Sequence, residues 1–244
     1  MKARVFFIMV ALFAAITTNA KTLVVYYSFT NNVHTIVSDL STQIDADVIR
    51  IEPAEKGIDY AANNYAAGSA LISAIRNNPD DAASYPTIDP VEVNIADYDM
   101  VIVAAPLWWS QMAAPLQTFL FQHGEEMAGK HIALIVSSAS SGISGVVADA
   151  KRLIPEGNFL EPNLWIRSSQ VSNRHSMIEQ WLKDINYTNI TSAITALDRD
   201  GEEEVLATYN IGGQRTADGQ SMTGIRITRH RKAGKIYSKK SIVK

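Results

Sequence analysis

Residues 99–112 read DMVIVAAPLWWSQM, and this stretch decides the fold class. The run 100–105 is apolar without alternation, which predicts a strand buried on both faces, as in a parallel sheet. Ligands of open parallel sheets bind beyond the carboxyl ends of the strands, and Trp108 and Trp109 follow this strand closely. An indole exposed there can stack on a flat heterocycle. The other indole is expected to pack against the alanine-rich residues 57–76, and packing alone is the alternative for both.

Strand and helix patterns alternate on both sides of this stretch. Short runs of β-forming residues predict strands at 23–27, 47–51, 100–105, 131–136 and 163–166. Helical spacing of apolar residues, or alanine-rich composition, predicts helices at 32–44, 57–76, 112–122, 143–154 and 175–185. Strands that alternate with helices are joined by right-handed crossovers. The sequence therefore predicts an α/β fold with a five-stranded, doubly wound parallel sheet.

A polar turn joins the first predicted strand directly to a helix and carries the first group of candidate binding residues. Backbone N–H groups at a helix N-terminus, together with hydroxyl groups, make an anion site. The candidates are Ser28, Thr30, Asn31, Asn32, Val33 and His34. The turn has neither the glycine fingerprint of NAD-binding proteins nor a Walker lysine, so neither dinucleotide nor ATP chemistry is indicated. The alternative is a helix N-cap formed by Thr30 or Asn32.

A further candidate loop, residues 137–145, reads SSASSGISG. Its small residues let a ligand approach backbone and hydroxyl groups closely, and the candidates are Ser138, Ser140 and Gly142. A flexible loop without a ligand is the alternative. Because the carboxyl ends of parallel strands share one edge of the sheet, the three loops together favour a binding site there.

The composition excludes several kinds of site. The 244 residues include no cysteine, so there is no disulfide framework, no thiolate nucleophile and no cysteine-ligated metal. The five histidines are not at metal-ligand spacing, and no metal is predicted. Residues 21–189 carry 10 Lys and Arg against 19 Asp and Glu, which argues against nucleic acid as a partner of this part. Residues 190–244 carry 10 against 6, and this reversal of charge predicts a domain boundary after residue 189.

The N-terminus has the three-part pattern of a secretory signal peptide, residues 1–20. Lys2 and Arg4 precede twelve apolar residues, 5–16, and a cleavage point follows Ala20. An uncleaved anchor or a buried first strand is the alternative. The signal predicts export, to the periplasm or to the cell surface or medium, with no membrane span left after cleavage.

The turn after the first strand resembles the Ser/Thr-x-Thr-Gly-Asn-Thr phosphate loop of the flavodoxin-like family. Ser28, Thr30 and Asn32 match that motif, whereas Asn31 stands where Gly is usual and Val33 where Thr is usual. Asparagine tolerates positive φ better than other non-glycine residues, so the turn can still form. Valine removes one hydroxyl contact to a phosphate.

Two further stretches carry the same resemblance. Residues 99–109 and 114–120 are similar to the third strand, flavin loop and following helix of the family's branch with a Pro-x-Trp-Trp loop. Tyr60 and Tyr65 also resemble that branch. The resemblance covers residues 21–187.

This resemblance implies FMN as the cofactor. The phosphate would lie on residues 28–34, Trp108 or Trp109 would flank the isoalloxazine ring, and residues 138–142 would complete the pocket. Other members of the implied flavin loop are Pro106, Leu107 and Ser110. Acidic surroundings would lower the flavin potential. The implied function is an exported FMN-binding redox protein, for electron transfer or quinone-type reduction. The alternative is a flavodoxin-fold module without cofactor that acts as a binding or surface protein.

The pattern changes after residue 189. Short β segments separated by glycine-containing turns at 212–213 and 233–234 predict a β-rich extension at 204–211, 222–229 and 235–243. The extension resembles the C-terminal sorting tails of Bacteroidetes secreted proteins. A small β appendage that covers the sheet edge is the alternative.

Overall fold

The computed structural model describes residues 20–192, 204–210, 215–216, 224–232 and 235–243. The chain divides into two units, of which the larger spans Ala20–Ile194 and the smaller contains the C-terminal strands. The larger unit continues past the boundary predicted at residue 189, because residues 187–192 are helical. Apart from Ala20, the predicted signal peptide lies outside the described residues.

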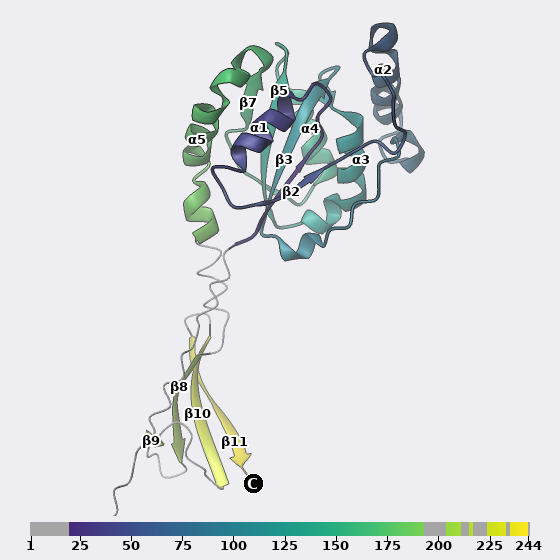
Figure 1. Ribbon diagram of the computed structural model, residues 1–244. Helices are drawn as coiled ribbons and strands as arrows, with labels where there is room; N and C mark the ends of the chain where they lie inside the picture. The colour runs from purple at the N-terminus through teal and green to yellow at the C-terminus, as the bar shows by residue number, and fades with distance from the viewer. Residues whose placement is uncertain (1–19, 193–203, 211–214, 217–223, 233–234, 244) are drawn as a thin grey trace, which may run out of the picture. The chain divides into compact units, whose positions relative to one another are not determined.

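A parallel sheet forms the centre of the larger unit, with the strand order β2-β1-β3-β5-β6 (Figure 1). Two further strands lie off this path, since β4 pairs with β3 and β7 pairs with β5. The strands are β1 (Thr22–Tyr26), β2 (Asp47–Arg50), β3 (Met100–Trp108), β4 (Gln111–Met112), β5 (His131–Ser138), β6 (Asn158–Phe159) and β7 (Leu164–Arg167). All pairings are parallel except that of β3 with the short β4. The predicted α/β fold is confirmed.

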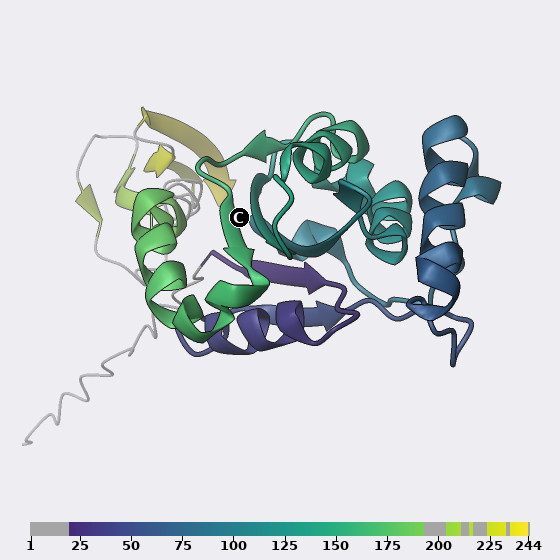
Figure 2. The same ribbon diagram turned by 90° about the horizontal axis from the view of Figure 1, so that it is seen from above.

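Helices cover both faces of the sheet because both faces are apolar. Leu23 and Val25 of β1 belong to one hydrophobic core, and Val24 and Tyr26 belong to the other. Figure 2 shows α1 and α5 on one side of the sheet and α3 and α4 on the other. The helices are α1 (Asn32–Leu40), α2 (Ala62–Asn77), α3 (Ala114–His123), α4 (Ser144–Leu153) and α5 (Arg174–Asp184). Short 3₁₀ helices lie at η1 (Ala82–Ser84), η2 (Ile95–Asp97), η3 (Gly124–Met127) and η4 (Ser168–Asn173).

The structure differs from the elements predicted from the sequence at three places. The strand predicted at 163–166 is present as β7, but a further short strand that was not predicted, β6, pairs with the other end of β5. The predicted loop after residue 105 is instead a continuation of β3 to Trp108, followed by a tight hairpin to β4. The predicted helix at 57–76 begins only at Ala62 and has left-handed backbone at residues 63–65.

The smaller unit is a four-stranded antiparallel sheet with the order β11-β10-β8-β9. Its strands are β8 (Glu204–Asn210), β9 (Arg215–Thr216), β10 (Gly224–Lys232) and β11 (Lys235–Val243). The predicted β-rich extension is confirmed, while the predicted turns at 212–213 and 233–234 lie outside the described residues. Within the described residues, no helix combines the length and apolar character that crossing a membrane requires.

Candidate functional site

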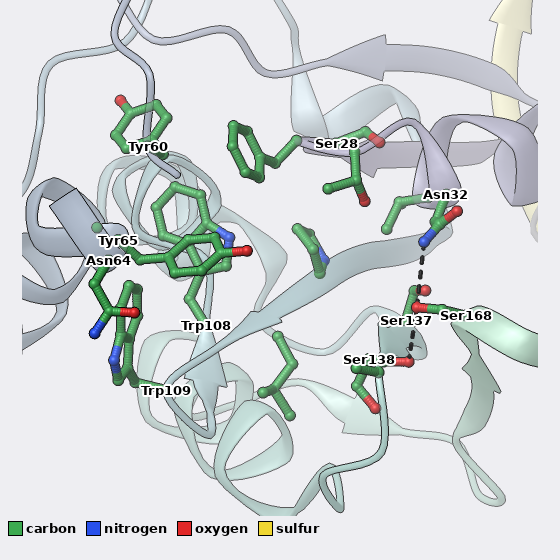
Figure 3. A pocket seen from close by; sticks show the side chains of 17 residues that line it. Ser28, Asn32, Tyr60, Asn64, Tyr65, Trp108, Trp109, Ser137, Ser138 and Ser168 are labelled. Atoms are coloured by element: carbon green, nitrogen blue, oxygen red, sulfur yellow. Dashed lines mark hydrogen bonds between the residues drawn. The ribbon is translucent and has the colours of Figure 1, made fainter. Parts of the chain in front are cut away.

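A cavity of about 390 Å³ opens at the carboxyl ends of β1, β3 and β5. Figure 3 shows aromatic side chains at one end of it and hydroxyl and amide side chains at the other. The lining residues are Ser28, Phe29, Thr30, Asn32, Val33, Tyr60, Asn64, Tyr65, Gly68, Pro106, Leu107, Trp108, Trp109, Ser137, Ser138, Ala139 and Ser168. The three segments predicted to share one edge of the sheet therefore meet in one cavity.

The structure brings most of the predicted binding residues to this cavity. Those that line it are Ser28, Thr30, Asn32, Val33, Pro106, Leu107, Trp108, Trp109 and Ser138. The predicted residues outside the lining are Asn31, His34, Ser110, Ser140 and Gly142. His34 is turned to Tyr26, whose hydroxyl lies 2.8 Å from His34 Nδ1.

The turn after β1 leaves polar groups without partners beside the cavity. Asn31 takes the left-handed conformation, with φ of 62°, that glycine would supply, and its side chain does not cap α1. The Ser28 hydroxyl accepts a hydrogen bond from the His34 amide at 3.1 Å. The Thr30 hydroxyl and the backbone N–H of Asn32 have no hydrogen-bond partner among the described residues. Neither Thr30 nor Asn32 therefore caps the helix, which was the alternative interpretation of this turn.

Packing explains why Val33 stands where the phosphate-loop motif usually has Thr. Its side chain is 2% exposed and packs in the hydrophobic core between the sheet and helices α1 and α5. The backbone N–H of Val33, at the second position of α1, donates to no capping side chain. Valine at this position therefore contributes to packing while its N–H group remains available to a ligand.

The two tryptophans have different environments. Trp108 is 8% exposed and makes an edge contact with Tyr27, with ring centroids 5.6 Å apart, and a tilted contact with Tyr60 at 5.0 Å. Trp109 is 41% exposed and meets Tyr65 edge-on at 6.2 Å. Trp108 is thus mainly a core residue that also lines the cavity, and Trp109 is the exposed member of the pair.

Trp109 also lies against the alanine-rich helix, as expected for one of the pair. A Cβ atom added at Gly68 of α2 would come within 2.9 Å of Trp109 Cζ3 and 3.5 Å of Trp108 Cε3. Glycine at position 68 is therefore what permits this close approach of α2 to the indole rings.

Hydrogen bonds connect the polar end of the cavity across three strands. Ser168 donates from its hydroxyl to the Ser138 carbonyl at 3.3 Å and accepts from Asn32 Nδ2 at 3.3 Å (Figure 3). The Ser138 hydroxyl donates to the Ser141 carbonyl at 2.9 Å and accepts from Trp165 Nε1 at 2.9 Å. The turn before α1 is thereby held against the ends of β5 and β7.

The cavity wall is electrically neutral, since none of its lining residues is Asp, Glu, Lys, Arg or His. Burial raises the pKa of Tyr27 behind the wall, and the nearby Tyr60 hydroxyl adds to the shift. Burial, and then the charge of Glu55, raises the pKa of Tyr60. Both tyrosines therefore stay protonated at neutral pH. Among the described residues, no group of His, Asp and Glu is placed to hold a metal ion.

The lining residues that the sequence did not offer as candidates are Tyr60, Asn64, Tyr65, Gly68 and Ser168, while Phe29, Ser137 and Ala139 lie in the predicted segments 28–34 and 137–145 without being singled out there. Tyr60 and Tyr65 had contributed only to the resemblance. Ser168 follows β7 at its carboxyl end, so applying the strand-end rule to the last strand would have found it. Gly68 gave no local signal, because its role depends on the packing of α2 over the tryptophans.

Comparison with known proteins gives the family of the chain. A candidate flavoprotein from Bacteroides eggerthii has a similar structure, with a TM-score of 0.56 and 24% identity over 69% of this chain and 99% of that one. A flavoprotein from Lactobacillus acidophilus, solved in complex with FMN, has a TM-score of 0.50 and 21% identity over 64% of this chain and 99% of that one. No curated protein matches this chain. The flavodoxin family model matches residues 21–185. Because that match spans most of the chain, the protein belongs to the flavodoxin family.

Proposed function

We propose that the protein binds FMN in the cavity at the strand ends and acts as an exported redox protein. The observation that carries the proposal is one cavity with two chemically different ends, a hydroxyl and amide end at the start of α1 and an aromatic end at Trp109 and Tyr65. FMN has the same division, with a phosphate at one end and a flat ring system at the other. The similar protein from Lactobacillus acidophilus was solved with FMN bound.

The residues at the polar end fit a phosphate. The Thr30 hydroxyl and the first amides of α1, at Asn32 and Val33, have no capping partner among the described residues. The N-terminus of a helix favours an anion through these amides and through its dipole. Arg50 approaches the same turn from β2, where its guanidinium donates to the Ser28 carbonyl at 3.3 Å. This end of the cavity would therefore hold the phosphate.

The residues at the aromatic end fit the isoalloxazine ring. Trp109 and Tyr65 are exposed, whereas Trp108 and Tyr60 are buried, contact each other and also line the cavity. Aromatic faces stack on flat heterocycles and exclude water from them. Bound FMN would supply one- and two-electron redox chemistry, while the chain binds and orients the ring.

The absence of charged side chains from the cavity lining favours an uncharged electron acceptor. The lining has no cationic side chain to pair with a charged acceptor, and the helix N-terminus at the polar end is already assigned to the FMN phosphate. A quinone-type compound, or the exposed ring edge of another redox protein, needs no such charge. We therefore propose electron transfer or quinone-type reduction as the role of the site.

The competing function is a module that has lost FMN and serves as a binding or surface protein. It was favoured by Asn31 and Val33, the two departures from the phosphate-loop motif. Asn31 adopts the glycine-like conformation, and Val33 keeps its amide at the helix start. Both observations support the FMN-binding protein over the cofactor-free module.

Export is proposed from the signal pattern in residues 1–20. One contact supports cleavage after Ala20. The Lys21 backbone nitrogen donates to Asp99 Oδ2 at 3.0 Å, so cleavage would place a new ammonium group beside a carboxylate. The C-terminal sheet belongs to a separate unit, and its resemblance to sorting tails leads us to propose a role in sorting for it.

The absorbance spectrum of the purified mature protein tests the redox function. We expect oxidised-flavin bands after purification or after addition of FMN and gel filtration, and bleaching of these bands by dithionite. A colourless protein that retains no added FMN would favour the cofactor-free module.

A further inference from the structure

The hairpin that carries Trp109 has an unfavourable turn. Trp109 and Ser110 lie between β3 and β4 and have φ values of 47° and 64°. Two-residue hairpin turns with positive φ at both positions strongly favour Asn-Gly, because other residues pay a steric penalty there. A Trp-Ser sequence does not hold this turn by itself, so contacts from elsewhere must stabilise it.

Helix α4 provides these contacts. A Cβ atom added at Gly145 would overlap the Ser110 carbonyl oxygen and lie 2.6 Å from Gln111 Nε2. One turn further along α4, the Asp149 carboxylate accepts a hydrogen bond from the Met112 amide at 2.9 Å. The Asp149 side chain is only 8% exposed, so this bond is shielded from water.

Both backbone groups of Met112 are bonded by side chains. Gln117 Nε2 donates to the Met112 carbonyl at 2.7 Å, while Asp149 accepts from its amide. Arg152 joins the two, since its Nη2 donates to Gln117 Oε1 at 2.9 Å and lies 3.4 Å from Asp149 Oδ1. Met112, Asp149, Arg152 and Gln117 thus form a closed ring of hydrogen bonds behind the hairpin.

We infer that Asp149 is a positioning residue for the flavin ring: through the Met112 amide it fixes the hairpin that presents Trp109 to the cavity. The inference rests on the proposed FMN site. Asp149 does not line the cavity, so it acts on the ring through the hairpin and has no direct contact with the phosphate end. Loss of Asp149 should therefore weaken FMN and riboflavin by the same factor, because both carry the ring and only FMN carries the phosphate.

Flavin-fluorescence titrations of three variants test this role. Asp149→Ala leaves the buried Met112 amide without an acceptor and should weaken both flavins by about tenfold. Asp149→Asn keeps an oxygen acceptor and should stay within about threefold of the wild type. The matched control is Asp39→Ala, which removes a carboxylate of similar burial that pairs with Arg174 and His175 between α1 and α5. It should leave the affinity for both flavins unchanged.

A second measurement needs no flavin. Hydrogen exchange of the flavin-free protein should be faster in residues 107–112 of Asp149→Ala than in the wild type, with residues 32–40 unchanged. If Asp149→Ala does not fold, Gly145→Ala replaces it, because alanine favours α4 itself and its Cβ atom would displace Ser110 and Gln111 of the hairpin. Gly145→Ala should also weaken both flavins and make hydrogen exchange faster in residues 107–112.

The outcomes separate the inference from the proposed function. Wild-type protein that binds neither flavin overturns the FMN site, and the positioning role with it, whatever the exchange experiment shows. Wild-type binding with an unaffected Asp149→Ala, a loss confined to FMN, or an equal loss in Asp39→Ala overturns the positioning role alone. Unchanged exchange in residues 107–112 also overturns it.

Discussion

The α-carbon of Gly68 lies so close to the indole of Trp109 that an added Cβ atom would come within 2.9 Å of Trp109 Cζ3. This contact joins α2 to the hairpin after β3, two segments that line the aromatic end of the cavity. Because Trp109 is 41% exposed, its ring can move when the contact is disturbed. The position of the indole therefore depends on the absence of a side chain at residue 68.

Substitution of Gly68 tests the aromatic end of the site. Overpacking of this kind costs about 1–3 kcal/mol, and here it would displace Trp109. We expect Gly68→Ala to weaken FMN and riboflavin equally, by about tenfold, in a fluorescence titration. Ser69→Ala, one residue further along α2 and outside the cavity lining, is the control. Unchanged affinity in Gly68→Ala would show that Trp109 does not contact the ring.

Substitution of Thr30 tests the polar end. A charge-assisted hydrogen bond to phosphate contributes about 1.5–3 kcal/mol, so Thr30→Ala should weaken FMN by about tenfold or more. Riboflavin, which has no phosphate, should respond far less. Both ligands are titrated against the same protein. Equal losses of FMN and riboflavin would contradict the assignment of the phosphate to this turn.

The sequence predicted the strands because their signal is local. Leu23, Val24 and Val25 form a continuous apolar run, and such a run identifies a strand buried on both faces wherever it lies in the sheet. The strand-end rule then brought Ser28, Trp108 and Ser138 into one cavity without knowledge of any distance. The general position of the site could therefore be predicted.

The details that depend on packing could not be predicted. Trp109-Ser110 carries no turn signal, so the sequence predicts an open loop where the structure has the hairpin to β4. The hairpin is stabilised by contacts from α4 rather than by its own residues. Residues 63–65, Asn-Asn-Tyr, have left-handed backbone inside α2, although this stretch lacks glycine and proline. Of the three candidates in the loop 137–145, only Ser138 lines the cavity.

Two buried carboxylates should give opposite dependences of stability on pH. Burial raises the pKa of Asp149 above 3.8, so the folded state binds its proton more tightly than the unfolded state does. This contribution to stability is present at low pH and is lost as the pH rises through the folded-state value. Relative to the wild type, Asp149→Asn should therefore gain stability as the pH increases from 3 toward 6, about the range in which carboxyls titrate.

Asp39 should behave in the opposite way. Burial acts to raise its pKa, but hydrogen bonds from Gln43 and His175 and the charges of His175 and Arg174 outweigh it and lower the pKa. Its contribution is present above 3.8 and is lost as the pH falls through the folded-state value. Asp39→Asn should lose stability relative to the wild type as the pH rises. Urea unfolding across this range measures both differences, and slopes of the same sign would contradict the assignment.

The C-terminal part should be dispensable for the α/β fold. Residues 21–189 contain every strand of the parallel sheet, and the C-terminal strands belong to another unit. We expect residues 21–189, expressed alone, to unfold in one cooperative transition in urea. A longer form, residues 21–194, controls for the helical residues 187–192. The absence of a cooperative transition in both forms would place the C-terminal part in the fold.

The mature protein should begin at Lys21. The basic, apolar and small-residue pattern of residues 1–20 predicts cleavage after Ala20, and Asp99 lies 3.0 Å from the nitrogen that would become the new N-terminus. N-terminal sequencing of protein recovered from outside the cytoplasm is the measurement. A sequence that starts at Met1 would contradict the signal peptide.

The most direct test of the FMN site is a calorimetric titration of the flavin-free mature protein with FMN and, separately, with riboflavin. The polar end at Thr30 and the aromatic end at Trp109 together predict one FMN per chain, with riboflavin bound at least about tenfold more weakly because it lacks the phosphate contacts. Absence of heat with either flavin, or equal affinities for the two, would contradict a cavity that holds the ring at one end and the phosphate at the other.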